Sequence, residues 1–511
     1  GQVDTVLAQD QVVLSGDAGA RIIALGNTTV AATGGDNNIT GGEQTVIISG
    51  VGAPSNQYLI STGAGNDTIS AFETGTITGG TGTNVMNVSS SGANYVISAG
   101  KGDRVQFYGS GTRSLPSTTG GDDQVSVGGT FSTVDGAGVG FPLQLNSTLA
   151  GSNNIVLMEG QTGGSTITGT ADTLSGGTAS SMTASIVGSG NVVVAGQVST
   201  TSVVSASTGG SNAVFASPLT GSLLQATLAG ANDTVLGGRG TVRILATGAS
   251  VVAAGGATTN GGSLQITTTG SADTVAANGA TVTGIIGGTS NFLFGGTGRL
   301  SNVTISGSQD FVGVQSAAGS SLVVTGTGDN VLGGTGALNI TVTGSGDTVA
   351  AGTGTTNFSI GGSADYLFGD ENTVSSSASM TGTFSGSAGT LSLRGEKSSA
   401  ISLSGSGNVV FGPQSTLSGA SITVSGSSDT VYSGIGSTTV TSATSDALVF
   451  GESGGGALYF IGGNSGTATV VGGFGTSTGS IGLISGGTGV NIVPERCTIQ
   501  EDMSGHRKCA D

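Results

Sequence analysis

An aspartate that recurs at a nearly constant interval is the part of this sequence with the clearest chemical potential. Asp310, Asp329, Asp347 and Asp365 each follow a short run of glycine, serine or similar small residues, most clearly in residues 344–349 (GSGDTV). Carboxylates at a fixed interval can bind a hard cation such as Ca²⁺, which takes about six to eight oxygen ligands. Without a cation, carboxylates brought close together must take up protons or point into solvent.

These aspartates belong to a repeat that runs through most of the chain. Asp, Asn or another residue in their place recurs on average about every 19.5 residues, and self-similarity at a fixed period indicates a repeat architecture. The step from Asp365 to Gly389 is longer than the others, as expected if a loop is inserted at a corner. The positions are Asn154, Asp172, Asn191, Asn212, Asp233, Ser250, Asp273, Asn291, Asp310, Asp329, Asp347, Asp365, Gly389, Asn408, Asp429 and Asp446.

Apolar and polar residues alternate in two short runs of each repeat. After Asp347, Val349 and Ala351 form the first run, and Phe358 and Ile360 form the second. Alternation with period two predicts strands, and the glycines between the runs predict turns. A single coil cannot bury its own apolar face, but coils stacked about 4.8 Å apart share main-chain hydrogen bonds and a thin core. The sequence therefore predicts an all-β fold, a parallel β-solenoid (β-roll or β-helix) with about 18–20 residues and two short strands per coil.

Departures from the repeat divide the chain into four expected segments. They are N-terminal coils (residues 1–112), an irregular loop or ornamented coils (113–150), a regular solenoid (151–493) and a C-terminal tail (494–511). In the first segment, the steps from Asn84 to Asn94 and from Asn94 to Asp103 are about half a coil long.

The tail contains both cysteines and the only histidine of the chain. Cys497 and Cys509 are close together in the sequence, which predicts one local disulfide and an oxidising compartment. Two roles are open for the tail: a cap that blocks edge pairing at the end of the solenoid, and docking to a neighbouring subunit or the cell surface.

Composition argues against a nucleic-acid partner and against a membrane-spanning helix. The net charge is −17 and the 12 basic residues are scattered, whereas phosphate binding needs a clustered basic surface, so we expect no nucleic-acid partner. No apolar run is long enough to cross a bilayer as a helix, so we expect no transmembrane segment. The acidic balance predicts an acidic surface, which fits an exported protein, a cation binder or simple solubility.

Two phrases resemble the haemolysin-type, or RTX, glycine-aspartate repeat. They are residues 63–69 (GAGNDTI) and 100–105 (GKGDRV). The resemblance implies a parallel β-roll with Ca²⁺ bound by aspartates at its corners, in a protein secreted from bacteria or displayed on their surface. On it we base a candidate calcium set of Asp67, Asp103, Asp310, Asp329, Asp347 and Asp365. More loosely, the chain is similar to the Gly/Thr/Val-rich β-strand-repeat proteins that bacteria export as adhesins, surface layers or filaments.

The sequence also departs from the RTX pattern. In residues 344–349 the glycines stand one and three positions before the aspartate, where the family has them two and four or five before it. Asn replaces Asp in several repeats, although a hard cation prefers carboxylates. The alternative interpretation is a corner in which Asp and Asn are interchangeable because both bond their own backbone.

The residues needed for most catalytic sites are missing. His506, the only histidine, lies in the tail, so no pair of nucleophile and base can be identified in the repeats. Arg239, Arg243 and Asp233 are the best candidates for a polysaccharide-processing site, but surface side chains of this kind are mostly solvated. We therefore expect that the protein is not an enzyme.

Together these patterns predict a secreted structural or adhesive protein of the bacterial cell surface. We expect it to assemble with copies of itself into a filament, layer or extracellular matrix, with a cell-surface polysaccharide as a further candidate partner. Two alternatives remain: a calcium-binding RTX-like repeat region of an exported adhesin, and a polysaccharide-processing β-helix enzyme.

Overall fold

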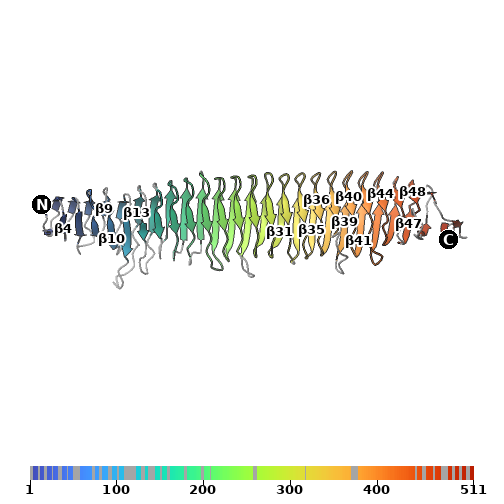
Figure 1. Cartoon of the computed structure of the whole chain (residues 1–511), viewed down its shortest axis with the longest axis horizontal. Helices are drawn as coiled ribbons and strands as arrows, with labels where there is room; N and C mark the ends of the chain where they lie inside the picture. Colours follow the sequence, from blue (N-terminus) through green and yellow to red (C-terminus); the bar gives the residue numbers. More distant parts are fainter. Residues whose placement is uncertain are drawn as a thin grey trace. The chain divides into compact units, whose positions relative to one another are not determined.

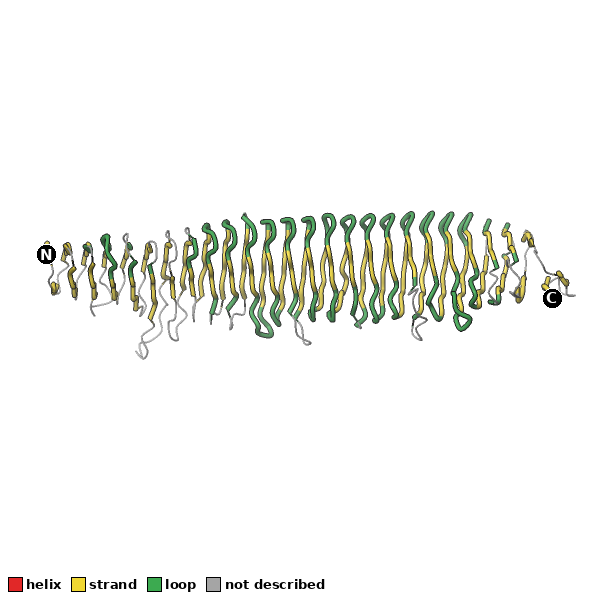
Figure 2. Tube along the Cα trace, viewed as in Figure 1, coloured by secondary structure: helices red, strands yellow, loops and turns green. Residues whose placement is uncertain are grey.

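The computed structural model describes most of residues 152–472 and, outside that interval, mainly strands. Within the interval the gaps are 158–161, 178–180, 197–200, 208, 257–261, 317, 370–377, 443–445, 452–455 and 464–466. The chain divides into two compact units: unit 1 comprises residues 1–256 and 262–264, and unit 2 comprises residues 257–261 and 265–511. In both units the regular elements of the described part are strands, and the remainder is turns and loops (Figure 2).

Each coil contributes one strand to each of two parallel sheets. The odd-numbered A-strands pair with A-strands of neighbouring coils, and the even-numbered B-strands pair with B-strands, as in β35–β37–β39 and β34–β36–β38 (Figure 1). Equivalent corners of consecutive coils, from Asp273 to Asp365, are separated by 18 or 19 positions. This confirms the predicted all-β parallel solenoid with two strands per coil and a coil length of about nineteen amino acids.

The strands have the following bounds. The A-strands are β1 (Asp4–Gln9), β3 (Ala20–Leu25), β5 (Asn37–Thr40), β7 (Tyr58–Ser61), β9 (Gly75–Thr78), β11 (Tyr95–Ala99), β13 (Asp122–Val127), β15 (Gln144–Leu149), β17 (Thr162–Ile167), β19 (Ser181–Ile186), β21 (Thr201–Ala206), β23 (Leu223–Leu228), β25 (Thr241–Ala246), β27 (Ser263–Thr268), β29 (Thr281–Ile286), β31 (Arg299–Ile305), β33 (Ser320–Val324), β35 (Leu338–Val342), β37 (Thr355–Ile360), β39 (Ser379–Phe384), β41 (Ser398–Leu403), β43 (Gly419–Val424), β45 (Ser437–Ser442), β47 (Leu458–Gly462), β49 (Ile481–Ser485) and β51 (Thr498–Glu501). The B-strands are β2 (Val12–Ser15), β4 (Asn27–Ala32), β6 (Gln44–Ser49), β8 (Thr68–Ala71), β10 (Val85–Ser89), β12 (Arg104–Tyr108), β14 (Thr133–Asp135), β16 (Ile155–Leu157), β18 (Thr173–Ser175), β20 (Val192–Val194), β22 (Ala213–Phe215), β24 (Thr234–Leu236), β26 (Val252–Ala254), β28 (Thr274–Ala276), β30 (Phe292–Phe294), β32 (Phe311–Gly313), β34 (Asn330–Leu332), β36 (Thr348–Ala350), β38 (Tyr366–Phe368), β40 (Thr390–Ser392), β42 (Val409–Phe411), β44 (Thr430–Tyr432), β46 (Leu448–Phe450), β48 (Ala468–Val471) and β50 (Val490–Val493). The last strand, β52 (Arg507–Ala510), pairs with A-strands.

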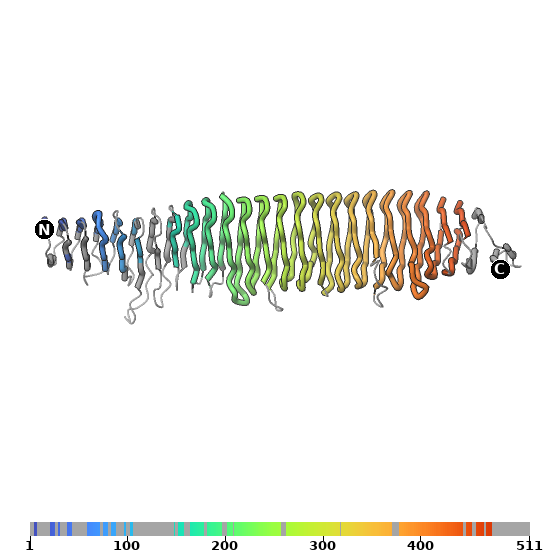
Figure 3. The backbone as a smooth tube through the Cα atoms, viewed as in Figure 1, coloured from blue at the N-terminus to red at the C-terminus, as the bar shows by residue number. Residues whose placement is uncertain are grey.

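The core of each coil is a thin apolar layer between the two sheets. Alternate side chains of both strands point inward, so that Val349 of β36 and Phe358 and Ile360 of β37 are at most 5% exposed. Successive coils of unit 2 follow nearly the same path, which stacks these side chains in columns (Figure 3). The predicted inward positions after Asp347 are confirmed.

Two positions of the predicted repeat are wrong by one residue. The pairings β24–β26 and β44–β46 place Val251 and Ala447, rather than Ser250 and Asp446, in the column occupied elsewhere by Asp or Asn. In both coils an apolar residue occupies the column. The polar residue directly before it, Ser250 or Asp446, is of the residue type expected at the repeat position. The longer step from Asp365 to Gly389 is confirmed, because β38 pairs with β40, and the connection from β38 to β39 includes residues 370–377, which are not described.

The segment expected to be irregular contains three strands of the solenoid. β13, β14 and β15 pair with strands of neighbouring coils. The rest of residues 113–150 lie outside the described part. In the first segment, Asn84 and Asp103 are one full coil apart because β10 pairs with β12, and Asn94 lies outside the described residues.

The C-terminal tail contributes an antiparallel hairpin. β51 pairs with β52, and β52 also pairs with β49, the last parallel A-strand of unit 2. An antiparallel strand on this edge has the topology of the predicted cap. The side chains of Cys497 and Cys509 lie outside the described residues, so the disulfide stays a prediction.

A search of the described residues for a helix long and apolar enough to cross a membrane finds none.

Candidate functional site

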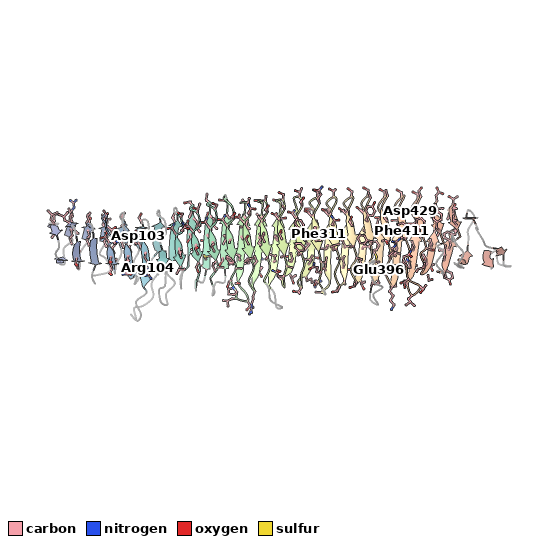
Figure 4. All side chains as sticks on the ribbon, viewed as in Figure 1. Asp103, Arg104, Phe311, Glu396, Phe411 and Asp429 are labelled. Carbon is pink, nitrogen blue, oxygen red and sulfur yellow. The ribbon has the colours of Figure 1, made fainter. Side chains whose placement is uncertain are left out.

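The repeated Asp and Asn side chains point into the coils, next to the start of each B-strand. The six residues of the candidate calcium set are between 0% and 2% exposed. Asp67 and Asp103 lie in unit 1, and the other four lie in consecutive coils of unit 2. Figure 4 labels Asp103 of unit 1 and Asp429 of unit 2, which are both buried residues of this kind.

Hydrogen bonds join these residues into a ladder. The N–H group of Asp310 donates to Oδ1 of Asp329 at 2.9 Å, Asp329 donates in the same way to Asp347 at 2.9 Å, and Asp347 donates to Asp365 at 3.0 Å. The same bond links Asn154 to Asp172 in unit 1 and Asn408 to Asp429 in unit 2. Each side chain thus satisfies a buried main-chain N–H group at the corner where the chain enters the next strand.

Asparagine members add a second bond that an ionised aspartate cannot make. Nδ2 of Asn408 donates to Oδ1 of Asp429 at 3.1 Å and to the carbonyl oxygen of Gly386 at 3.0 Å. Nδ2 of Asn291 donates to the carbonyl oxygen of Gly287 at 2.7 Å. In Asp310, Asp329 and Asp429, the equivalent atom Oδ2 is buried without a hydrogen-bond partner. Only the protonated carboxyl has a donor at this position.

In most coils a glycine three residues before the ladder residue makes room for its side chain; Asp67, with Ala64 at that position, is an exception. A Cβ atom on Gly344 would lie 2.3 Å from Oδ2 of Asp347 and 1.9 Å from the carbonyl oxygen of Gly326 in the preceding coil. Gly326 and Gly362 stand in the same relation to Asp329 and Asp365. At Gly326, Gly344 and Gly362 the glycine is therefore fixed by contact rather than by backbone conformation. Gly209 and Gly288, the equivalents before Asn212 and Asn291, have in addition a positive φ of 87° and 94°.

The residue directly before each ladder position has a left-handed backbone conformation. Its φ lies between 53° and 68° in the consecutive coils from Asn153 to Ser428, whether it is Gly, Asn, Ser, Ala or Gln. Ser250 follows this rule, with φ of 56°, which supports the shifted position of Val251. The residue before this one is mostly Ser or Thr, and it forms a bridge with its equivalent in the next coil, from Ser271 through to Ser427.

Burial changes the acidity of the ladder carboxyls. Burial raises the pKa of Asp329 to about 7; the N–H group of Asp310 lowers it, while the negative charges of Asp310 and Asp347 add to the rise. Burial likewise raises the pKa of Asp347 to about 6, with the charge of Asp365 adding to the rise. Burial also raises the pKa of the isolated ladder residues Asp172, Asp233 and Asp429.

The hydrogen bonds fit a structural ladder better than a calcium site. Ca²⁺ takes about six to eight oxygen ligands, whereas Oδ1 of these carboxyls already faces an N–H group and Oδ2 packs against a glycine. The described residues contain no group of three or more His, Cys, Asp or Glu side chains that could hold a metal. Closely spaced carboxylates can bind a cation, take up protons or point into solvent. Burial excludes the solvent, and the hydrogen bonds of Oδ1 and the packing of Oδ2 favour protonation over a cation.

The ladder is interrupted where its position holds no polar side chain. At Gly389, the ring of Phe384 fills the space, since a Cβ on Gly389 would lie 2.5 Å from the tip of that ring. The N–H group of Gly389 still donates to Oδ1 of Asn408 at 3.0 Å. The main-chain N–H group of each coil thus depends on the side chain of the following coil. A coil that lacks a polar ladder residue can still donate this hydrogen bond.

The surface is less acidic than the composition predicts. The buried acidic residues are Asp67, Asp103, Asp172, Asp233, Asp273, Asp310, Asp329, Asp347, Asp365, Asp429 and Glu396. They account for more than a third of the acidic residues of the chain. These carboxyl groups therefore do not contribute to the surface charge that the composition predicts.

The two outer faces of unit 2 differ in chemistry. We call the outward-facing residues of the B-strands from β28 to β48 (even numbers only) the B-face. It carries many apolar and aromatic side chains and no Asp, Glu, Lys, Arg or His. The outward-facing residues of β29–β47, which we call the A-face, are mostly Ser, Thr and Asn, as in Asn357 and Thr381. Sequence reasoning missed the B-face, although its residues stand one and three positions after each ladder residue.

Aromatic rings stack along the B-face. The ring centroids of Phe411 and Tyr432 are 5.2 Å apart, and those of Tyr432 and Phe450 are 5.0 Å apart, with interplanar angles of 8° and 11°. A second cluster contains Phe292, Phe294 and Phe311, and Figure 4 labels Phe311 and Phe411.

The residues considered for polysaccharide processing do not form a site. Asp233 is buried in the ladder, where Oδ1 accepts the N–H group of Asn212 at 2.9 Å. Arg239 lies in a turn, and Arg243 lies on the outer side of β25. The carboxyl and the guanidinium groups therefore do not share a surface.

Comparison with models of known protein families gives no match for this sequence. Comparison with curated proteins gives no significant match either.

Proposed function

We propose that the chain is an exported structural or adhesive protein of the bacterial cell surface that assembles with copies of itself into a filament, layer or matrix. The observation that carries the proposal is that each long face of unit 2 keeps its character from coil to coil. The A-face is mostly Ser, Thr and Asn, and the B-face combines apolar and aromatic side chains with Thr and Asn and has no charged residue on its strands. A surface that repeats with every coil offers many equal contacts to a partner with the same period, and such contacts add in avidity. The bacterial surface origin is supported by the RTX-like phrases around Asp67 and Asp103, and the oxidising compartment by the two cysteines of the tail.

Purified full-length protein is expected to form ordered polymers or sheets at micromolar concentration. Repeated faces favour side-by-side contacts, which extend in one direction once two copies have aligned. Negative-stain microscopy combined with light scattering measures the assemblies directly. A protein that stays monomeric throughout a concentration series up to the millimolar range contradicts the proposal.

A calcium-binding repeat region of an exported adhesin is the second candidate, supported by the six carboxyls of the candidate calcium set. If the ladder is held by hydrogen bonds alone, EDTA is expected to leave the β-type circular dichroism and the melting temperature unchanged within about 1 °C. Adding Ca²⁺ is then expected to have equally little effect. A loss of β-structure in EDTA that Ca²⁺ restores and Mg²⁺ does not would show that calcium stabilises the coils.

A further inference from the structure

The B-face is a strip to which ten of the eleven B-strands from β28 to β48 contribute at least one apolar or aromatic side chain, and β40 contributes only Thr390 and Ser392. Phe292, Leu332 and Tyr366 are 42%, 43% and 54% exposed, although they are large and apolar or aromatic. They recur on strands of one parallel sheet, so their side chains stand on the same side of unit 2. Contiguous apolar patches of several hundred Å² on soluble proteins mark interaction sites.

We propose that the B-face of unit 2 is the surface through which two copies of this chain associate, face to face. This inference rests on the proposed self-assembly and assigns its pairing step to the B-face; growth beyond the pair uses other surfaces of the chain.

The size of the strip is sufficient for such an interface. The B-strands from β28 to β48 are stacked at about 4.8 Å, and a short strand of this kind is about 10 Å long, which gives about 500 Å² per copy. Two copies then bury about 1,000 Å², the lower limit for a specific interface. Two sheets pack face to face at about 10 Å, so the side chains of both strips fill the space between them.

The charge of unit 2 allows two copies to approach. Among the side chains that the structure describes in this unit, only Asp446, Arg299, Arg394 and Lys397 are charged and exposed. Asp446, Arg299 and Lys397 lie off the B-face. Arg394 follows β40 and reaches over the B-face, with its guanidinium carbon 5.8 Å from the ring centre of Phe411. The strands of the strip themselves carry no charge, and the one cation that the described residues place over it, Arg394, is stacked on Phe411, a contact that stays favourable when it is desolvated.

The orientation of the rings favours a protein partner over a sugar polymer. A sugar stacks on the open face of an aromatic ring, because the electron-rich face attracts its C–H groups. In the row of Phe411, Tyr432 and Phe450 the ring faces are turned toward one another, so the ring edges point outward. Ring edges and aliphatic side chains are suited to the interdigitated packing of two apolar sheets.

Lysines introduced on each face of the full-length chain test the assignment. Tyr366→Lys combined with Tyr432→Lys places two charges on the B-face, and Asn357→Lys combined with Thr381→Lys places the same charges on the A-face of neighbouring coils. Sedimentation velocity over a concentration series measures association, and circular dichroism verifies that each variant is folded. We expect the B-face variant to raise the dissociation constant at least about 100-fold and the A-face variant to change it less than about 3-fold.

The outcomes separate this inference from the proposed function. If the wild type assembles and the B-face variant assembles equally well, self-assembly stands and the B-face is not its surface. If the wild type is monomeric at all concentrations, both proposals fail. If a monomeric wild type binds a soluble β-glucan or an apolar peptide, and Tyr366→Lys abolishes that binding, the face belongs to that partner and the second copy is excluded.

Discussion

Gly344→Ala is expected to destabilise unit 2 by about 3 kcal/mol or more, whereas Gly346→Ala, two residues away, costs about 1 kcal/mol. The first Cβ would meet the carbonyl oxygen of Gly326 at 1.9 Å and Oδ2 of Asp347 at 2.3 Å. Neither atom can retreat, because the main chain of the neighbouring coil is held by the sheet and the carboxyl by the ladder. The second Cβ would have no atom within 4 Å.

Alanine already occurs in other coils at the position equivalent to Gly346. Gly346 has φ of 68°, and the equivalent positions of other coils of unit 2 hold Ala272 and Ala364 with φ of 57° and 56°. The left-handed conformation is thus already accepted by alanine at this corner. Guanidinium unfolding followed by circular dichroism measures both variants, and hydrogen exchange in residues 326–350 localises the effect. Equal costs for the two variants would indicate that backbone conformation, not contact, fixes the glycine at position 344.

The spacing of the coils could be predicted from the sequence because the corner has strict requirements. From Asp172 to Asp429 each Asp or Asn of the ladder has a glycine three positions earlier and a left-handed residue directly before it, so a shift of the pattern by one residue would break a contact or a hydrogen bond. Where the ladder residue is replaced, as at Val251 and Ala447, the phrase loses its marker and the prediction slips by one residue. The apolar alternation after Asp347 indicated both strands correctly.

The direction of the aspartate side chains could not be predicted in the same way. An isolated carboxylate is costly to bury, which made solvent or a cation the natural partners of Asp310 and Asp329. The structure supplies a partner with no sequence signal, the main-chain N–H group of the same corner one coil earlier. The exchange of Asp for Asn along the column was the one available hint, because both provide the oxygen Oδ1.

The B-face could have been identified from the sequence with one further step. Once the ladder residue is fixed, the B-strand residue two positions later points inward, and those one and three positions later point outward. Phe292 and Phe294 flank the buried Leu293 in this way. The uncharged character of the face follows only when this rule is applied to every coil, including those whose ladder residue is missing.

Asp329→Asn is expected to stabilise unit 2 by as much as about 4 kcal/mol at pH 8 and to change its stability little at pH 4. Burial raises the pKa of Asp329 to about 7, from 3.8, and the charges of Asp310 and Asp347 add to this rise. Well below pH 3.8 the carboxyl is protonated in both the folded and the unfolded chain, so its titration no longer affects stability. Between about pH 4 and pH 7 the unfolded chain releases the proton while the folded chain retains it, so stability falls as the pH rises.

The wild-type protein is therefore expected to melt at a higher temperature at pH 5 than at pH 8, opposite to the usual loss of stability in acid. Asparagine removes the titration and retains the ladder, since its Oδ1 accepts the N–H group of Asp310 and its Nδ2 has a donor geometry already present in Asn408. Asn291→Asp is the converse variant, which lengthens the run of carboxyls beside Asp310. It should lower the melting temperature at pH 8 and leave it nearly unchanged at pH 4.

Thermal melts of the three proteins from pH 4 to pH 8, followed by circular dichroism, distinguish a protonated ladder from an ionised one. Asp446→Asn serves as the control, because it removes a carboxyl of the same charge from an exposed position. If the control flattens the pH dependence as much as Asp329→Asn does, the effect comes from the net charge of the surface. If neither variant changes it and added Ca²⁺ does, the buried carboxyls are ionised and held by the cation. A change confined to Asp329→Asn and Asn291→Asp shows that the titrating protons lie inside the coils. The four consecutive aspartates are then neutral because they are protonated and not because they share a cation.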